Sequence, residues 1–329
     1  MPLNAKMALT VAKVLETAHC SVKETLKELT EAPLEEEDES APTPDNFWQD
    51  VGGATQQIAS EVAKLTLALT QPPKPAASIA QSIVNGVEAA WTSLVTACRR
   101  SPPKGSLLRK ELRTAVLRTG EALATLLKAL KAAESGPQLQ MTGCVWEACS
   151  ALEKLPRDNL AATRALLARE EMLLTDALQE IEEEVKCSRL SENEEVDNSA
   201  NWTNQDRELL APCVGLVRTA RASIKKVSEA VRLRGNCKEP GGAQQLDRLA
   251  VAAEKLSPAV DTFVAAVYPP MNKSAVSSTA LSVVTVVREF LELARQSDVT
   301  AEMDNEWLSF LLRAVDHNNN KVQPLLSPD

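Results

Sequence analysis

The sequence predicts an all-α protein made of two consecutive antiparallel helical bundles, each of about five helices. Only 3% of the 329 residues are aromatic, so the core must be built of Leu, Val and Ala, a composition that favours helices over sheets. Apolar residues recur at steps of three or four between proline and glycine breakers, and no alternating strand pattern of useful length occurs. The length suits about two domains of ~150 residues.

Five helices are expected in the first half of the chain. The first, from Leu3 to Leu29, gives way to the segment TEAPLEEEDESAPTPD, whose prolines and acidic residues indicate a solvated loop. The next four are expected at Asp45 to Thr70, Ala76 to Arg100, Ser106 to Glu134 and Leu139 to Leu155. The strings QPPKP, SPPKG and SGP separate them and end each helix by proline or glycine chemistry.

A sixth helix is expected from Pro156 to Val185, with Asp158 or Asn159 placed to accept bonds from its first free amides. Its apolar residues form a seam at seven-residue spacing with a four-residue offset: Leu160, Leu167, Leu174, Leu178, Ile181 and Val185. We expect this seam to build the core of the second bundle. The alternative is that it offers a face to a partner helix.

A polar, acidic segment follows at about residues 188–203, and it is expected to be an exposed, flexible loop. Four further helices are expected at Asp206 to Arg234, Ala243 to Val267, Ser274 to Ser297 and Thr300 to Val322. We place the domain boundary at Pro156, which gives an N-terminal bundle over residues 1–155 and a C-terminal bundle over residues 156–329. The acidic loop is the competing place for that boundary.

The totals exclude several classes of function. A net charge of −9 argues against a general nucleic-acid binder, which would carry a basic excess. The sequence shows no signal peptide and no apolar run of about 18 residues, so a soluble intracellular protein is expected. With two histidines and none of the common catalytic or nucleotide-binding motifs, we expect neither an enzyme nor a cofactor.

A metal site is not favoured by the cysteine and histidine positions. Cys144 and Cys149 lie five residues apart on one expected helix, about 140° around its axis, and His19 and Cys20 are adjacent and point apart. Packing roles explain both pairs. The basic segment from Arg218 to Lys238 indicates either an anionic partner or a solvated face neutralised by the acidic loop just before it, and we favour the second.

Three short motifs could serve regulation or docking. Pro72, Lys74 and Pro75 give the P-x-x-P spacing that SH3 modules bind, although prolines that end a helix explain the same string. Ser101 precedes a proline with Lys104 beyond it, which marks a candidate phosphosite for a proline-directed kinase. The L-x-x-L-L strings at residues 123–127 and 308–312 match coactivator helices, but core positions of a Leu-rich bundle give that spelling too.

Several local strings resemble one family, the D-type-cyclin-binding GCIP or Maid proteins. They begin at residue 47 and run in order to the C-terminal helix: FWQDV, SEVAKLTLALTQPP, VWEAC, PRDNLAA, DRELLAPCVGLVRTARASIKKV, QLDRLAVAAEKLSPAVD, YPPM and AVDH. The strings are specific as a set and weak singly. The first 45 residues resemble the family only as a helix followed by an acidic stretch.

The resemblance implies an all-helical, non-enzymatic regulator that binds D-type cyclins and a signalling adaptor and restrains cell-cycle progression. It also implies pairing with helix-loop-helix transcription regulators without direct DNA contact, and a place in both cytoplasm and nucleus. The string GCVWEACSALEKLP before Pro156 fits the missing basic region, because it contains no cluster of Arg or Lys. The family motifs fix no cyclin-contacting residue.

The alternative function is a cytoskeletal or adhesion scaffold. Two consecutive five-helix bundles resemble vinculin and talin modules in architecture, and that likeness is an analogy of fold alone.

Overall fold

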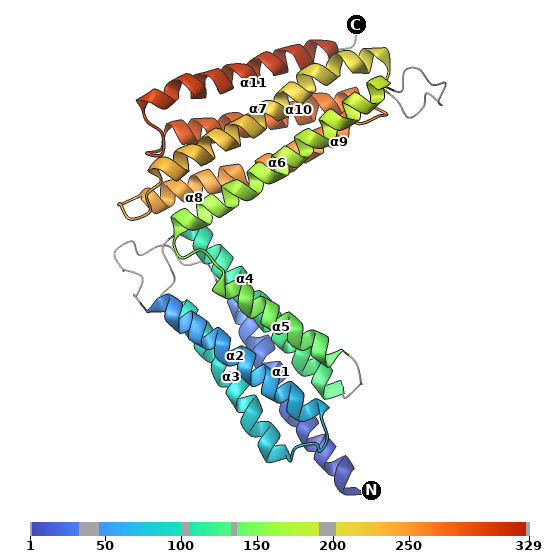
Figure 1. The fold of residues 1–329 in the computed structure, drawn as a ribbon, viewed down its shortest axis with the longest axis vertical. Coiled ribbons are helices and arrows are strands. Elements are labelled where there is room, and N and C mark those ends of the chain that lie inside the picture. Colours follow the sequence, from blue (N-terminus) through green and yellow to red (C-terminus); the bar gives the residue numbers. More distant parts are fainter. Residues whose placement is uncertain (1, 33–45, 101–104, 133–136, 191–201, 327–329) are drawn as a thin grey trace. The chain divides into compact units, whose positions relative to one another are not determined.

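The computed structural model describes residues 2–32, 46–100, 105–132, 137–190 and 202–326, and within these ranges the fold is all-helical, with no strand. This confirms the predicted fold class. The chain divides into two compact units, unit 1 over residues 1–158 and unit 2 over residues 159–329 (Figure 1). The division falls three residues after the predicted boundary, because Pro156, Arg157 and Asp158 still belong to unit 1.

The described residues of unit 1 form a bundle of five helices, as expected for the first half of the chain. They are α1 Pro2–Glu31, α2 Phe47–Thr70, α3 Ala77–Arg100, α4 Ser106–Ala132 and α5 Gln138–Glu153. Each helix packs on two or three others, in the ring α2, α3, α1, α4, α5 that closes on α2. The prolines and glycines identified in the sequence lie between the helices, so each element ends within a few residues of its predicted end.

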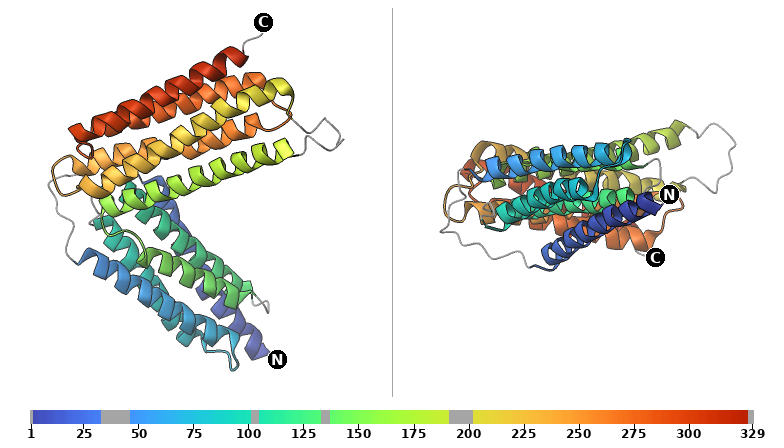
Figure 2. Two further views of the ribbon diagram at one scale, coloured as in Figure 1. Left: turned by 45° about the horizontal axis from the view of Figure 1, so that its top comes forward. Right: turned by 90° about the horizontal axis from the view of Figure 1, so that it is seen from below.

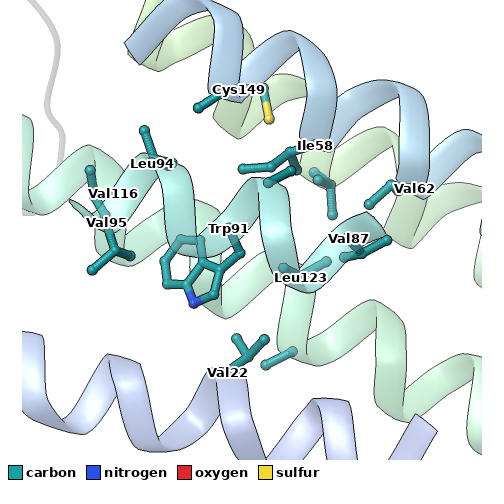
Figure 3. Packing of buried hydrophobic residues seen from close by; sticks show 14 of the residues in the cluster. Val22, Ile58, Val62, Val87, Trp91, Leu94, Val95, Val116, Leu123 and Cys149 are labelled. Carbon is teal, nitrogen blue, oxygen red and sulfur yellow. The ribbon is translucent and has the colours of Figure 1, made fainter. Parts of the chain in front are cut away.

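The core of unit 1 surrounds Trp91 of α3, which is 2% exposed. Its indole lies among buried side chains that include Val22 of α1 and Leu123 of α4 (Figure 3). The close fit requires Gly120 of α4, because a Cβ atom at this position would lie 2.6 Å from Cη2 of Trp91. One large aromatic ring therefore fills the space that the many small aliphatic residues leave.

The last residues of unit 1 are held by Trp48 near the start of α2. Its indole Nε1 donates to the carbonyl of Arg157 at 3.0 Å, and the Arg157 guanidinium lies 4.7 Å from the centre of the ring. Arg157 also donates to the carbonyl of Glu153 at 2.8 Å. The contacts fix the chain as far as Arg157 on unit 1, directly before α6 begins in unit 2.

Unit 2 contains six α-helices and one short 3-10 helix among its described residues. They are α6 Asn159–Leu190, α7 Asn204–Arg234, α8 Gly242–Ala253, α9 Leu256–Val267, α10 Lys273–Arg295, η3 Glu302–Asp304 and α11 Asn305–Leu326. The pairs in contact include α6 with α7, α8 and α9, and α11 with α7 and α10. Figure 2 shows these helices from two further sides.

One predicted helix of unit 2 is two helices in the structure. The segment from Ala243 to Val267 is interrupted by a turn at Glu254 and Lys255, which separates α8 from α9. The physical reason is Pro258, which has no backbone N–H and whose ring would clash with the carbonyl of Glu254 in a continuous helix. Placed in the first turn of α9, the same proline is tolerated.

The predicted acidic loop at residues 188–203 lies mostly outside the described residues, since those from 191 to 201 are not described. At its start, α6 continues to Leu190. At its end, Trp202 is 4% exposed and donates to the carbonyl of Val267 at 2.7 Å. Thr203 and Asp206 cap the start of α7 reciprocally. The backbone N–H of Asp206 donates to the Thr203 hydroxyl at 3.2 Å, and the backbone N–H of Thr203 donates to the Asp206 carboxylate at 2.9 Å.

Helix α10 is long and apolar enough to cross a membrane by composition, with a mean hydropathy of 1.2 over its most apolar window. In this fold it packs against α7, α8, α9 and α11. Val276, Val283, Val287 and Phe290 on its inner face are at most 1% exposed. Packing in unit 2 accounts for the inner part of this apolar surface, since 39% of the apolar window is buried.

Candidate interaction surface

No group of three or more His, Cys, Asp or Glu side chains in the described ranges is arranged to hold a metal ion. Cys149 is buried in unit 1, and burial followed by the charge of Glu153 raises its pKa to about 11. Cys144 and Cys20 are exposed instead. Cys144 and Cys149 therefore lie on different sides of α5, in keeping with their angular separation.

Unit 1 contains two of the candidate regulatory motifs, the phosphosite at Ser101 and the P-x-x-P string at Pro72. Ser101, the candidate phosphosite, lies outside the described residues. Pro72 and Lys74 are exposed and Pro75 is half-buried, but the Lys74 ammonium donates to the carbonyl of Leu69 at the end of α2. In the structure this string completes the end of a helix, as the simpler interpretation of the prolines expects.

Both L-x-x-L-L strings face the cores of their units. Leu123, Leu126 and Leu127 of α4 are fully buried. In α11, Leu308 is fully buried and Leu312 is 9% exposed, whereas Phe310 between them is 61% exposed. Since a coactivator helix must present its leucines to a receptor groove, these strings act as packing positions.

The leucine seam of α6 points into unit 2. Leu167 and Leu174 are fully buried and Ile181 is 1% exposed, while Leu160, Leu178 and Val185 are half-buried. These residues therefore form the inner stripe of α6. A partner helix could reach them only if α6 moved away from its neighbours α7, α8 and α9.

Three of the six basic residues of α7 between Arg218 and Arg234 form ion pairs within unit 2. Arg218 pairs with Glu182 of α6 at 2.6 Å, Lys226 pairs with Glu229 at 3.3 Å, and Arg234 pairs with Asp304. The α6 glutamate therefore serves as a counter-charge. The sequence predicts that the acidic loop at residues 188–203 neutralises this face, but that loop lies mostly outside the described residues, and the counter-charges seen here lie on α6, on α7 itself and on η3.

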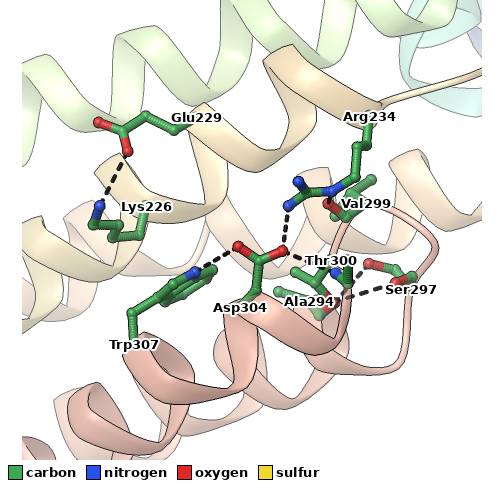
Figure 4. A network of polar contacts seen from close by, with 10 residues as sticks. Lys226, Glu229, Arg234, Ala294, Ser297, Val299, Thr300, Asp304 and Trp307 are labelled. Atoms are coloured by element: carbon green, nitrogen blue, oxygen red, sulfur yellow. Dashed lines mark hydrogen bonds and ion pairs between the residues drawn. The ribbon is translucent and has the colours of Figure 1, made fainter.

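A hub of polar contacts at Asp304 joins the end of α7 to the start of α11 (Figure 4). The Asp304 carboxylate accepts from the amide of Ala301 at 2.8 Å, from the indole of Trp307 at 2.8 Å and from the Arg234 guanidinium. Burial would raise the pKa of Asp304, but these donors together hold the pKa below its usual value. The carboxylate is thus ionised at neutral pH and ties three elements of unit 2 together.

The α6–α9 edge of unit 2 is negative. Burial raises the pKa of Asp261, and the nearby carboxylates of Glu170 and Glu180 raise it further. Burial and the charge of Glu180 raise the pKa of Tyr268 to about 12, with smaller effects from its hydrogen bond to Glu180 and from Glu184. Negative charge gathered at this edge disfavours contact with nucleic acid.

An apolar surface crosses α2 and α5 in unit 1. We call it the α2–α5 surface and define it by Leu67 of α2 and by Leu139, Gly143 and Trp146 of α5. Leu139 is 70% exposed, Leu67 is 57% exposed and Trp146 is 49% exposed. Exposed tryptophan is the residue type most enriched among energetically dominant interface positions.

Direct contacts between α2 and α5 hold this surface rigid. The hydroxyl groups of Thr66 and Thr142, both buried, share a hydrogen bond of 2.8 Å. The Trp146 indole donates to the carbonyl of Ala59 at 3.2 Å, which lays the ring across the two helices. A Cβ atom at Gly143 would meet nothing within 4 Å, so the surface is open beside the ring.

The opposite flank of α2 carries a different feature. A groove of about 690 Å³ runs between the start of α2 and the end of α3, and small or polar residues such as Gly53, Gln57, Ser93 and Thr96 line it. Because this groove has no exposed large apolar anchor, the α2–α5 surface is the better candidate for a protein partner in unit 1.

Sequence reasoning did not identify the α2–α5 surface. Trp146 was noted only within the string VWEAC, and Leu139 only as the start of a helix. A signal was present, because Leu139 and Trp146 share a face of α5 that the buried Val145 and Cys149 do not occupy. Apolar residues on two faces of one amphipathic helix indicate that the second face serves something other than the core.

Two models of one protein family match this chain, and together they extend from α2 to α10. The N-terminal domain described as "Grap2 and cyclin-D-interacting" matches residues 50–186, and the corresponding C-terminal domain matches residues 174–292. The two matches overlap within α6, the first helix of unit 2.

The chain is similar along most of its length to several vertebrate proteins. A Xenopus laevis protein named "Cyclin-D1-binding protein 1 homolog" is 34% identical over 294 residues, covering 85% of this chain and 89% of the relative. A Danio rerio homolog is 32% identical over 300 residues, covering 86% and 87%. The Homo sapiens "Cyclin-D1-binding protein 1" is 29% identical over 305 residues, covering 85% and 84%. The chain belongs to the Grap2 and cyclin-D-interacting protein family.

Proposed function

We propose that this protein binds a D-type cyclin and restrains cell-cycle progression without catalysing a reaction of its own. The carrying observation is membership of a family whose named relatives are cyclin-D1-binding proteins at up to 34% identity over 294 residues. The described residues also form a helical scaffold with exposed apolar side chains, and such side chains are typical of protein-binding surfaces.

The α2–α5 surface is the proposed contact with the cyclin. Trp146 and Leu139 supply apolar anchors, and Gly143 leaves space in which a partner side chain can pack against the indole. The hydrogen bonds of Thr66 and Trp146 fix the geometry in advance, so little conformational entropy is lost on binding.

The test places one arginine on each flank of α2 in the full chain. Gly143→Arg sets a charged side chain on the α2–α5 surface, and Gly53→Arg sets the same side chain in the α2–α3 groove. Neither position has an atom within 4 Å of the new Cβ, so both variants should fold with at least the wild-type melting temperature. Calorimetric titration with a purified D-type cyclin then compares the affinities.

We expect Gly143→Arg to weaken cyclin binding by about tenfold or more, and Gly53→Arg to leave it unchanged. If Gly143→Arg binds the cyclin as tightly as the wild-type chain, the contact lies away from the α2–α5 surface. Loss of affinity in both variants, with normal melting curves, would mean that the contact also covers the α2–α3 groove.

Pairing with helix-loop-helix transcription regulators and silencing of transcription are included in the proposal, with one structural condition. Leu167, Leu174 and Ile181 are buried, so pairing through the α6 seam would require unit 2 to open. Hydrogen exchange of α6 amides should then accelerate when such a partner is added. Exchange that stays unchanged in a formed complex would mean that the partner uses another face.

The proposal also includes a signalling adaptor as partner, because the description of the family names Grap2. Pro72 is exposed at the end of α2 and is available to an SH3 module, provided that Lys74 releases the Leu69 carbonyl. Action in both cytoplasm and nucleus would suit these partners, and imaging of the tagged chain tests it.

A further inference from the structure

Helix α11 lies at the edge of unit 2. Of the described elements it packs mainly on α7, α10 and the short helix η3, and its other side is uncovered in Figure 1 and in the left view of Figure 2. The exposed residues on this side recur at helical spacing. We call them the outer face of α11 and define it by Glu302 of η3 and by Glu306, Phe310, Arg313 and Lys321 of α11.

The outer face has an apolar centre. Phe310 is 61% exposed, although a phenylalanine buried on folding would contribute roughly 1.5–3 kcal/mol. Met303, next to Glu302, is 79% exposed and extends the apolar part. Phe310 thus leaves a large apolar group in water in the middle of a charged helix face.

The charges on the outer face are ordered along the helix. Glu302 and Glu306 come before Phe310, and Arg313 and Lys321 come after it. All four side chains are exposed, and none takes part in the ion pairs or side-chain hydrogen bonds found within the described ranges. By contrast, Arg288 of α10 and Asp316 on another side of α11 are paired with each other.

The order of charges makes the outer face complementary to itself. When two copies of α11 pack antiparallel with the two-fold axis beside Phe310, the acidic half of one copy lies against the basic half of the other. Glu306 is four residues before Phe310 and Arg313 is three residues after it, so these two residues face each other across the axis twice. The two Phe310 rings then cover one another at the centre.

The helix dipole favours the same order of charges within one chain, with acids at the start and bases at the end. The dipole does not account for Phe310, and it does not require Glu306 and Arg313 to stand at similar distances on the two sides of an apolar residue. Self-association accounts for the order of the charges, for the exposed Phe310 and for the similar spacing of Glu306 and Arg313 about it.

We propose that the outer face of α11 is a self-association surface, and that its occupant is α11 of a second copy of this chain in an antiparallel, two-fold arrangement. Helix α11 has 22 residues and is roughly 33 Å long, so the contact is small and the dimer is weak. Its attraction is partly ionic and therefore falls with added salt.

The test is sedimentation velocity of the full chain from about 1 µM to about 300 µM, a range that brackets weak association through a small interface. The variants are Glu306→Arg, Arg313→Glu and Phe310→Ser. Arg248→Glu, at an exposed residue of α8, serves as a charge-change control away from α11. Melting curves by circular dichroism verify that each variant is folded.

The wild-type chain and the Arg248→Glu control are expected to dimerise with similar affinity. Glu306→Arg and Arg313→Glu alone are each expected to weaken the dimer by roughly tenfold or more, because every Glu306–Arg313 contact becomes repulsive. A mixture of the two is expected to dimerise again, since each arginine then faces a glutamate. Phe310→Ser is expected to abolish the dimer.

A wild-type chain that stays monomeric over the whole range overturns the proposal. A dimer that persists in Phe310→Ser, or one that the mixture of charge variants fails to restore, overturns it as well by placing the contact elsewhere. If the chain is monomeric and Phe310→Ser lowers affinity for a D-type cyclin, the face belongs to the cyclin and not to a second copy.

Discussion

Replacing Gly120 with alanine is expected to destabilise unit 1, although alanine is the better helix former. A Cβ atom at Gly120 would lie 2.6 Å from Cη2 of Trp91 and 2.7 Å from Cδ2 of Leu26. Carbon atoms pack favourably at about 3.5–4.0 Å, so both neighbours would have to move by close to 1 Å. Trp91 is 2% exposed and enclosed by side chains of other helices, which leaves its ring nowhere to go (Figure 3).

The magnitude follows from two opposing effects. Alanine in place of glycine within a helix contributes about 1 kcal/mol. Overpacking a closed core costs about 1–3 kcal/mol, and a contact this short with a rigid ring belongs at the upper end of that range. The expected net result is a loss of ~1–2 kcal/mol in the free energy of unfolding, or a fall of several degrees in melting temperature.

Gly143→Ala is the matched control, because Gly143 also lies inside a helix but its Cβ would meet nothing within 4 Å. That variant should be stabilised by up to about 1 kcal/mol. Urea unfolding followed by circular dichroism compares the two. If both variants gained the same stability, the close packing of Gly120 on Trp91 would be refuted.

Two further variants probe unit 2. Leu174→Ala should lower the free energy of unfolding by ~2–5 kcal/mol, because Leu174 is fully buried. Leu173→Ala is the control, and it should cost far less because Leu173 is 37% exposed. Equal losses for the two variants in urea unfolding would contradict the core role of the seam. Asp304→Asn should flatten the fall of stability in acid. The folded-state pKa of Asp304 is lowered, so its carboxylate stabilises the fold above the unfolded pKa of about 3.9 and loses that effect as the pH drops through the folded pKa. The melting temperature of each protein is measured from about pH 3 to about pH 7. An equal fall with decreasing pH in the wild-type chain and in Asp304→Asn would contradict this prediction.

The helices were predictable because their apolar spacing and their end signals agree. The prolines of QPPKP end α2, and Leu167, Leu174 and Ile181 were expected in the core from their spacing alone and are buried. The break between α8 and α9 was not predicted, since proline has two outcomes in this chain. Pro212 is accommodated inside α7, whereas Pro258 ends one helix and begins another. Only the packing of neighbouring helices decides between these outcomes.

The candidate surfaces were harder to predict than the helices. Trp146, Leu139 and Phe310 are apolar, and composition alone assigns such residues to a core. Which face of an amphipathic helix turns inward depends on the neighbours that cover it, and α5 and α11 each present apolar groups on a second face that no described helix covers. A sequence read one helix at a time lacks that information.

The central claim is that this chain binds a D-type cyclin while folded. Calorimetric titration of the purified chain with a D-type cyclin, alone and in complex with its kinase, tests it most directly, after circular dichroism has verified a cooperatively melting helical fold. We expect saturable binding and a melting temperature that rises in the complex. Absence of binding by an equally well-folded chain would contradict it, and cosedimentation with actin filaments would then test the scaffold alternative.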